Sequence, residues 1–436
     1  MSSCVAEVSS KYLADVAKNG VPVGYKQTEV GLIPEDWQIV TLNNLSEKIM
    51  VGIASAATHA YRDRGVPFLR NQNILPNRLD DSDILFITPE YEQTFQNKRL
   101  KSGDLLTART GYPGTTCIVP EQYCGAQSFT TLITRLKLGS ALPNYVSAYM
   151  NSELGQKFFE LNQIGGGQKN VNSAILKTLP LPLPKLEEQT AIANALSDVD
   201  ALISELEKLI AKKQAIKTAT MQQLLTGRTR LPQFALREDG TPKGTKPSEL
   251  GEIPEDWEVA KIGDFAPLQR GFDLPSSSRV DGKYPVVYSN GIVNTHCHFQ
   301  VKGPGVVTGR SGTLGKVHYV EDDYWPHNTS LWVTKFNGTE PKFIYFVFTY
   351  IGFERFASGS GVPTLNRNDA HSYKLVIPTT EAEQTAIATI LADMDEELQA
   401  LEQRLSKTRQ IKQGMMQELL TGKTRLIKPS KEVIHE

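Results

Sequence analysis

Two glycine-rich loops carry side chains that are suited to reading the edges of nucleic-acid bases. Arginine and lysine bind phosphates, and arginine can also bind guanine through two parallel hydrogen bonds. Glycine lets the backbone come close to a ligand because it has no Cβ atom. These loops, ARTGYPG and GRSGTLGK, are therefore candidate nucleic-acid contacts. Their candidate residues are Arg109, Thr110, Tyr112, Arg310, Ser311, Thr313 and Lys316.

Further polar side chains follow two runs that predict β-strands, residues 66–70 (VPFLR) and 284–288 (YPVVY). Asparagine and glutamine can bind adenine with two hydrogen bonds. Taken singly, each polar residue is explained as well by a turn or a solvated surface. The set at matched positions favours nucleic-acid contact. The further candidates are Arg70, Asn71, Gln72, Asn73, Lys169, Asn170, Tyr288, Ser289, Asn290, Asn366 and Arg367.

Catalytic patterns are not found in the sequence. A Walker-type phosphate loop requires glycine where Arg310 stands, and serine or threonine where Val317 stands. The tetrapeptides Asn-Pro-Pro-Tyr and Asp-Pro-Pro-Tyr of adenine methyltransferases are absent, as is any diagnostic Ser/His/Asp or paired-carboxylate spacing. His296 and His298 could converge on a metal, but a polar strand edge explains them better. The sequence predicts a binding protein with no catalytic residue and no metal of its own.

The composition predicts a cytoplasmic protein of two or three domains, because 436 residues exceed the usual size of one domain. No apolar run reaches the roughly 18 residues of a membrane helix, and residues 1–20 lack an apolar signal core. The four cysteines form no CxxC pair. The net charge of −1 does not by itself suggest a nucleic-acid partner. Residues 40–180 and 260–375, however, each carry a small basic excess.

An internal repeat organises the whole chain. The pentapeptide IPEDW occurs at 33–37 and again at 253–257. A longer match pairs residues 187–231 (EEQTAIANAL…LLTGRTRL) with residues 382–426 (AEQTAIATIL…LLTGKTRL). The segments between these landmarks match only weakly, as in the two glycine loops. The order is globule, helix, globule, helix, with helices that are alike and globules that differ. The tryptophan of each IPEDW is expected to pack inside its domain.

The two matching segments predict long helices with an a/d seam of the coiled-coil type. Pro184 and Pro378 precede them, and Gly227 and Gly422 suit their C-terminal ends. If the seams pack together they must run antiparallel, which predicts an α+β fold with a pseudo-two-fold internal repeat. The alternative is that they bind another chain. The seam residues are Ile192, Leu196, Val199, Ile203, Leu206, Ile210, Ile387, Leu391, Met394, Leu398, Leu401 and Leu405.

From residue 28 to 426 the chain resembles the specificity subunits of type I restriction–modification enzymes. The resemblance rests on the duplicated G-x-I-P-x-D-W phrase, the G-R-x-G-x-x-G-K loop, the E-Q-x-x-I-A-x-x-L helix start and L-L-T-G-x-x-R-L. It implies two α/β target-recognition domains separated by two long conserved helices. The expected parts are an extension (1–27), recognition domain one (28–180), a central helix (181–231), a linker (232–247), recognition domain two (248–375), a C-terminal helix (376–426) and a tail (427–436).

The same resemblance implies a non-catalytic subunit that reads a bipartite, asymmetric duplex DNA target, one half per recognition domain. The helices would set the spacing and dock two methylation subunits, and restriction subunits would join them. S-adenosylmethionine, ATP and Mg²⁺ are expected on those partners and not on this chain. Two alternatives stay open: a stand-alone tandem DNA-binding scaffold, and an enzyme hidden in the divergent globules.

Overall fold

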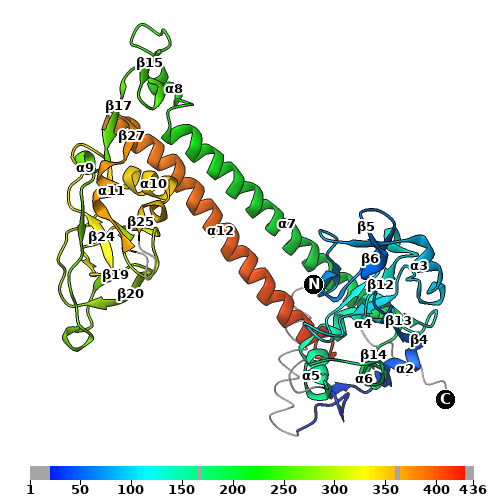
Figure 1. Cartoon of the computed structure of the whole chain (residues 1–436). Helices are drawn as coiled ribbons and strands as arrows, with labels where there is room; N and C mark the ends of the chain where they lie inside the picture. Colours follow the sequence, from blue (N-terminus) through cyan, green and yellow to red (C-terminus); the bar gives the residue numbers. More distant parts are fainter. Residues whose placement is uncertain (1–19, 165–168, 359–363, 428–436) are drawn as a thin grey trace. The chain divides into compact units, whose positions relative to one another are not determined.

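The computed structural model describes residues 20–164, 169–358 and 364–427. The chain divides into two compact units, and Figure 1 labels the elements of each. Unit 2 is Leu206–Gln403, and unit 1 contains the described residues on either side of it. Each long helix is thus shared between the units, because the start of one helix packs in the same unit as the end of the other.

Unit 1 is built on short β-sheets covered by helices. The hairpin β1–β2 leads into β3, which pairs antiparallel with β14. Two four-stranded sheets follow, in the orders β11-β10-β13-β4 and β12-β6-β9-β5. The strands are β1 (Tyr25–Thr28), β2 (Gly31–Pro34), β3 (Gln38–Thr41), β4 (Ser46–Val51), β5 (Tyr61–Arg62), β6 (Val66–Leu69), β9 (Leu85–Ile87), β10 (Leu105–Thr107), β11 (Thr116–Ile118), β12 (Gln127–Ser128), β13 (Leu132–Leu136) and β14 (Pro180–Leu183).

Unit 2 repeats this plan with longer central strands. The hairpin β15–β16 leads into β17, which pairs antiparallel with β27. The two sheets have the orders β18-β24-β21-β22 and β20-β19-β23. The strands are β15 (Thr245–Ser248), β16 (Gly251–Pro254), β17 (Trp257–Lys261), β18 (Leu268–Arg270), β19 (Tyr284–Tyr288), β20 (Gly291–His296), β21 (Gly305–Gly309), β22 (Val317–Val320), β23 (Trp325–Pro326), β24 (Ser330–Val333) and β27 (Lys374–Pro378).

Helices begin where the local sequence supplies caps. Proline stands in the first turn of α4 (Pro143–Met150) and of α10 (Pro341–Ile351), where its missing N–H costs nothing. Ser152 caps α5 (Glu153–Asn162) by accepting a hydrogen bond from the backbone N–H of Gly155. The apolar faces of α4 and α10 fill the two main cores. Shorter helices near the predicted site are α6 (Ser173–Lys177), α11 (Arg367–Ser372) and the 3₁₀ turn η2 (Asn71–Asn73).

The predicted long helices are α7 (Leu186–Leu225) and α12 (Glu381–Leu419). Within unit 2 they run antiparallel, since Lys213 pairs with Glu397 while Lys217 pairs with Asp395 (Figure 1). Within unit 1, Asp200 near the start of α7 pairs with Lys412 near the end of α12. The antiparallel prediction is therefore confirmed inside each unit.

The predicted seam is buried mainly where it joins a domain core. Ile192 and Leu196 pack with Leu419 and Leu420 in the core of unit 1. Ile387, Leu391 and Met394 pack in the core of unit 2 with Leu224 and Leu225. Leu206 and Leu398 are also buried, whereas Val199, Ile203, Ile210, Leu401 and Leu405 are half-buried.

IPEDW forms the centre of a buried polar cluster in unit 1. Trp37 is 1% exposed, and its indole N–H donates to Glu188 Oε2 at 3.1 Å. A buried carboxylate needs a cation, and Arg425 supplies it with hydrogen bonds to Glu188 (2.8 Å) and Asp36 (2.9 Å). The guanidinium also lies 5.7 Å from the Trp37 ring centroid. We call Asp36, Trp37, Glu188 and Arg425 the clasp of unit 1.

Unit 2 contains the same clasp, formed by Asp256, Trp257, Glu383 and Arg230. The indole N–H of Trp257 donates to Glu383 at 3.2 Å, and Arg230 binds both carboxylates. In unit 2 the arginine precedes the tryptophan along the chain, whereas in unit 1 it comes from the end of the chain. The segment after α12 thus supplies the arginine of the unit 1 clasp, and the segment after α7 supplies the arginine of the unit 2 clasp.

Glycines at the ends of the long helices complete both clasps. Gly227 and Gly422 have φ values of +69° and +68°, as expected for helix C-terminal ends. A Cβ atom on Gly227 would lie 2.7 Å from the Pro254 ring, and one on Gly422 would lie 2.4 Å from the Pro34 ring. The glycines therefore permit both the left-handed turn and its close contact with IPEDW.

The predicted domain limits shift by a few residues. β14 (Pro180–Leu183) crosses the predicted limit at 180, and β27 (Lys374–Pro378) crosses the one at 375. Both strands contain proline, and the sequence predicts only that Pro378 precedes the second long helix. Each lies in a two-stranded sheet, where an edge strand tolerates proline. The linker predicted at 232–247 contains α8 (Pro232–Ala235) and the start of β15.

Candidate nucleic-acid interface

In both units one group of predicted residues, 70–73 in unit 1 and 288–290 in unit 2, stands at the end of one strand of a parallel pair. β12 runs parallel to β6 in unit 1, and β23 runs parallel to β19 in unit 2. The carboxyl ends of parallel strands meet at the same sheet edge, which is where α/β sheets usually place their binding residues. The segments after both strands therefore come together, and we call each place the reading edge of its unit.

The reading edge of unit 2 joins three segments far apart in the sequence. The backbone N–H of Ser289, after β19, donates to Thr329 Oγ1 at 3.3 Å. The backbone N–H groups of Arg310 and Ser311 donate to the Thr329 carbonyl at 2.9 and 3.1 Å. The structure thus brings together the predicted residues 288–290 and 310–316, and it adds the segment that contains Thr329.

Arg310 presents its side chain from this edge without an internal partner. Its guanidinium makes no hydrogen bond or ion pair with the part of the chain that the structure describes. Its carbonyl accepts from the backbone N–H of Leu365 at 2.9 Å, which brings Asn366 and Arg367 close in sequence to the edge. Asn366 caps α11, whereas Arg367 is exposed.

The other predicted residues of this edge differ in exposure. Ser289 is buried, and Tyr288 and Ser311 are half-buried. Asn290, Thr313 and Lys316 are exposed, and Lys316 Nζ donates to the Asn290 carbonyl at 3.4 Å. A Cβ atom at Gly309 would lie 1.9 Å from the carbonyl oxygen of Thr313, so the close turn of this loop requires glycine.

His327 and Asn328, which were not predicted from the sequence, follow the parallel partner strand β23. The His327 ring lies on the Tyr288 ring, with centroids 4.2 Å apart. The Asn328 amide donates to Asp273, which also accepts from Arg270 at 2.9 Å. The available signal was the polar run His-Asn-Thr-Ser directly after Trp325-Pro326.

Burial lowers the pKa of the His327 imidazole below its usual range, and the nearby Asp273 only partly opposes this. His327 is therefore neutral at neutral pH and presents one N–H donor and one acceptor. Its Nδ1 lies 3.1 Å from Thr329 Oγ1. The ring can thus offer Nε2 to a partner.

The reading edge of unit 1 has the same construction. Asn71 accepts from the backbone N–H of Arg109 at 2.8 Å and lies 3.3 Å from the Thr130 hydroxyl. The Arg109 carbonyl accepts from the N–H of Val171 at 3.1 Å. Residues after β6, after β10 and after β12 therefore meet here, together with the segment that follows Lys169 and Asn170.

Three residues predicted after β6 make hydrogen bonds within unit 1, and one of them, Asn73, is buried. Arg70 pairs with Asp83 at 2.8 Å, and Gln72 donates to the same carboxylate at 3.0 Å. Asn73 is 2% exposed, and its amide donates to the carbonyls of Asp80 and Asp83. Because this leaves Asn73 no free surface, we keep it out of the proposed contacts. The strand predicted to include Arg70 ends at Leu69, where η2 begins.

The glycine loop of unit 1 presents Tyr112 from a tight turn. Tyr112 is 84% exposed, while its N–H donates to the Thr110 carbonyl and its carbonyl accepts from the Thr115 N–H. Gly114, with a φ of +93°, lies against the Phe159 ring and holds the base of the loop. The Arg109 guanidinium is half-buried and has no ion-pair partner among the described residues.

Residues 165–168, just before the predicted Lys169 and Asn170, and residues 359–363, shortly before the predicted Asn366 and Arg367, lie outside the described residues. Lys169 is exposed, and Asn170 forms a bridge with Ile164. Within the described ranges, no group of three or more His, Cys, Asp or Glu side chains could hold a metal ion. His296 packs edge-on against Trp325 and its Nδ1 faces the Val280 backbone. In those same ranges, no helix is long and apolar enough to cross a membrane.

A family model described as the type I restriction modification DNA specificity domain matches residues 34–218 and 254–412. The two matches cover more than half of the chain and coincide with the two repeats. The chain belongs to this family. It is a type I specificity subunit, the non-catalytic DNA-recognition component of its system.

Individual relatives support the assignment. A Methanocaldococcus jannaschii chain named as the specificity subunit of the type I restriction enzyme MjaX is 28% identical and covers 92% of this chain and 97% of its own length. The EcoBI specificity subunit of Escherichia coli is 23% identical over 44% of this chain and 41% of its own. The crystal structure of a type I restriction-modification system S subunit from M. genitalium shares the fold with a TM-score of 0.60 at 17% identity, and the match covers 88% of this chain and 96% of that one.

Proposed function

We propose that this specificity subunit reads a bipartite and asymmetric duplex, one half with each unit. The observation that carries the proposal is the repeated reading edge. In both units a glycine loop sets an arginine without an ion-pair partner beside the ends of two parallel strands. The residues around Arg109 and Arg310 differ between the units, so the two half-sites should differ as well.

Arginine and asparagine side chains would contact base edges, and lysines would contact phosphates. Unit 1 would use Asn71, Arg109, Thr110, Tyr112 and Lys169. Unit 2 would use Asn290, Arg310, Thr313, Lys316 and Arg367. Phosphate contacts release counterions, so affinity should fall steeply with salt.

The long helices would set the length of the unread gap between the half-sites. α7 has 40 residues and α12 has 39, and in each unit they pair antiparallel. The two helices would also dock two methylation subunits, because they are the parts of the repeat that stay alike. Restriction subunits would join this cytoplasmic complex. S-adenosylmethionine, ATP and Mg²⁺ would belong to the partners, and each methylation subunit would flip an adenine out of its half-site.

The decisive test is a map of N6-methyladenine in the host genome with the wild-type chain, without it, and with Arg109→Ala or Arg310→Ala. We expect a two-part motif with a fixed gap that disappears without this chain. Each variant should relax one half of the motif and leave the other half unchanged. A map that does not change on removal of the chain contradicts the proposal. DNA binding without any methylation partner would instead favour a stand-alone scaffold.

A further inference from the structure

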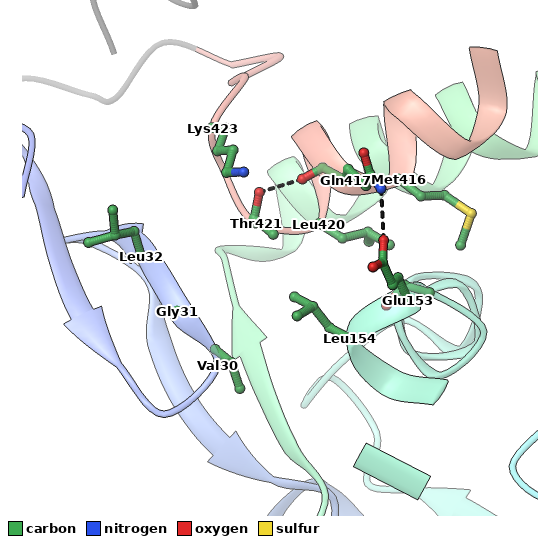
Figure 2. A pocket seen from close by; sticks show the side chains of 11 residues that line it. Val30, Gly31, Leu32, Glu153, Leu154, Met416, Gln417, Leu420, Thr421 and Lys423 are labelled. Carbon is green, nitrogen blue, oxygen red and sulfur yellow. Dashed lines mark hydrogen bonds between the residues drawn. The ribbon is translucent and has the colours of Figure 1, made fainter. Parts of the chain in front are cut away.

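Each unit has a groove at the end of a long helix, and the two grooves occupy matching places. The groove of unit 1 has a volume of about 460 Å³ and lies between the β1–β2 hairpin, the start of α5 and the end of α12 (Figure 2). The groove of unit 2, of about 680 Å³, lies between the β15–β16 hairpin, the end of α10 and the end of α7. Neither groove contains a residue of the reading edges.

The walls supplied by the long helices carry the same chemistry in both grooves. Leu420, Thr421 and Lys423 line the first groove, and Leu225, Thr226 and Arg228 line the second. Each triplet belongs to the L-L-T-G-x-x-R-L phrase at the same positions of the repeat. The hairpin walls also match in having an apolar residue before a glycine, Val30 in unit 1 and Leu250 in unit 2.

One cation, at the same position of the repeat, has no side-chain partner among the described residues in each groove. The Thr421 hydroxyl donates to the Gln417 carbonyl, and the Gln417 amide donates to Glu153 (Figure 2). Thr226 makes the corresponding bond to the Gln222 carbonyl. The side chains of Lys423 and Arg228, in contrast, have no hydrogen bond or ion pair with any described residue. Each groove therefore combines apolar surface with a cation that has no such partner, Lys423 or Arg228. The groove of unit 1 also contains Glu153, and that of unit 2 also contains Glu252, Arg355 and Lys374.

Apolar surface beside such a cation suits a partner chain that offers an apolar side chain next to a carboxylate. Exposed apolar surface such as Leu250, which is 50% exposed, favours a contact that removes it from water. A cation at the rim adds charge complementarity, which fixes orientation and excludes wrong partners. The same two features in both units call for the same occupant twice.

We propose that the two grooves are docking sites for two copies of one partner chain, each inserting an apolar residue flanked by a carboxylate. This inference rests on the proposed function, in which two methylation subunits bind one specificity subunit, and it adds where each copy is held. The reading edges differ because they face different DNA, whereas the grooves match because they face identical protein. Each copy is then held by the hairpin and helix end of a single unit.

The test uses the full chain co-expressed with the methylation subunit of its own host, and native mass spectrometry counts the bound copies. Lys423→Glu and Arg228→Glu should each reduce two copies to one, and the double variant should hold none. Lys423→Arg and Arg228→Lys should keep both copies. Lys302→Glu, an exposed change outside both grooves, is the matched control and should also keep both.

Several outcomes would overturn the inference. The double variant could still bind two copies, or either single variant could lose both. If the chain alone forms a dimer that the variants abolish, the grooves serve self-association instead. A wild-type chain that binds no methylation subunit would refute the proposed function itself, which is a different result from wild-type binding that the groove variants leave intact. Thermal unfolding of each variant checks that the fold is unchanged.

Discussion

The two clasps resemble each other much more closely than the two reading edges do. The clasps have the same four residue types in the same geometry, with indole-to-carboxylate distances of 3.1 and 3.2 Å. The reading edges share only a plan. Where unit 1 has the exposed Tyr112, unit 2 has Thr313, and where unit 1 has Phe129 after the parallel strand, unit 2 has His327 and Asn328.

The difference shows which parts of the repeat are constrained by folding. A buried tryptophan N–H requires an acceptor, the buried carboxylate requires a cation, and no single member can change without leaving another unsatisfied. Side chains at the reading edge face outward on loops that the sheets hold in place. They can change without harming the core, so one scaffold can present two different surfaces.

The largest effect is expected from breaking a clasp. Arg425→Met and Arg230→Met leave a buried glutamate without its cation and should each destabilise their own unit by about 3–5 kcal/mol. Chemical denaturation followed by tryptophan fluorescence can separate the units, because Trp37 belongs to unit 1 and the other tryptophans to unit 2. Arg237→Met is the control, since its pair with Glu255 is largely exposed. Equal losses from control and clasp variants would argue against a structural role for the clasps.

A smaller effect is expected at the reading edges. Arg109→Ala and Arg310→Ala should each weaken specific DNA binding by about 1–3 kcal/mol without changing thermal stability. Each variant should also lose discrimination in only one half-site, which competition binding with half-site mutants can measure. Arg279→Ala, an exposed change away from the edge contacts described above, is a control. Loss of discrimination in both halves would show that the units do not read independently.

Acid should weaken the clasps through their carboxylates. Burial disfavours ionised Asp256, but hydrogen bonds from Arg230 and Lys243 outweigh it and lower the pKa to about 2. Because the pKa of Asp256 is lower in the folded protein than its usual value of 3.8, its ionised form stabilises the fold at pH values above about 4. This stabilisation is lost as the pH falls from about 4 to about 2. Because Asp256 is partly exposed, we expect about 1 kcal/mol. Lys243→Met should move the loss to higher pH in acid titrations followed by fluorescence, whereas an unchanged midpoint would show that Lys243 has no part in it.

The smallest effect on DNA affinity is expected at the position where the two glycine loops differ, Tyr112 in unit 1 and Thr313 in unit 2. Tyr112 can stack on or between bases, and its loss should cost about 1 kcal/mol of DNA affinity. Tyr112→Phe should keep most of that affinity, and Tyr112→Ala should lose it. The reciprocal change Thr313→Tyr tests whether unit 2 gains what unit 1 loses. If Phe behaves like Ala, the hydroxyl and not the ring makes the contact.

Much of the fold follows from patterns that are local in the sequence. The step of three and four residues predicted both long helices, and the prolines and glycines at their ends predicted where they begin and end. The strand limits were harder to find. Pro378, which the sequence placed just before a helix, is also the last residue of β27. Nothing local in the sequence indicates that a proline lies in an edge strand of a two-stranded sheet.

The candidate site was predicted in part. The glycine loops were found because glycine and arginine are informative together. The structure joins each loop by hydrogen bonds to residues that follow a parallel strand, Asn71 in unit 1 and Thr329 in unit 2. Arg70, Gln72 and Asn73 were chosen by residue type, and only the structure shows that all three also hydrogen-bond to Asp83. His327 and Asn328 were missed because a parallel strand pairing brings them close to Tyr288 and Ser289, which are 39 positions earlier in the sequence. Such pairing leaves no local signal.

The sequence by itself determined the repeat, the long helices and the kind of protein, because periodicity and duplicated phrases are properties of residue order. Only the tertiary structure decided that the arginine after α12 completes the first unit while the arginine after α7 completes the second. It also decided which polar side chains of the described residues are left without partners and which form hydrogen bonds within the protein. The physical reason is that burial and ion pairing depend on residues hundreds of positions apart, which come together only when the helices pair antiparallel.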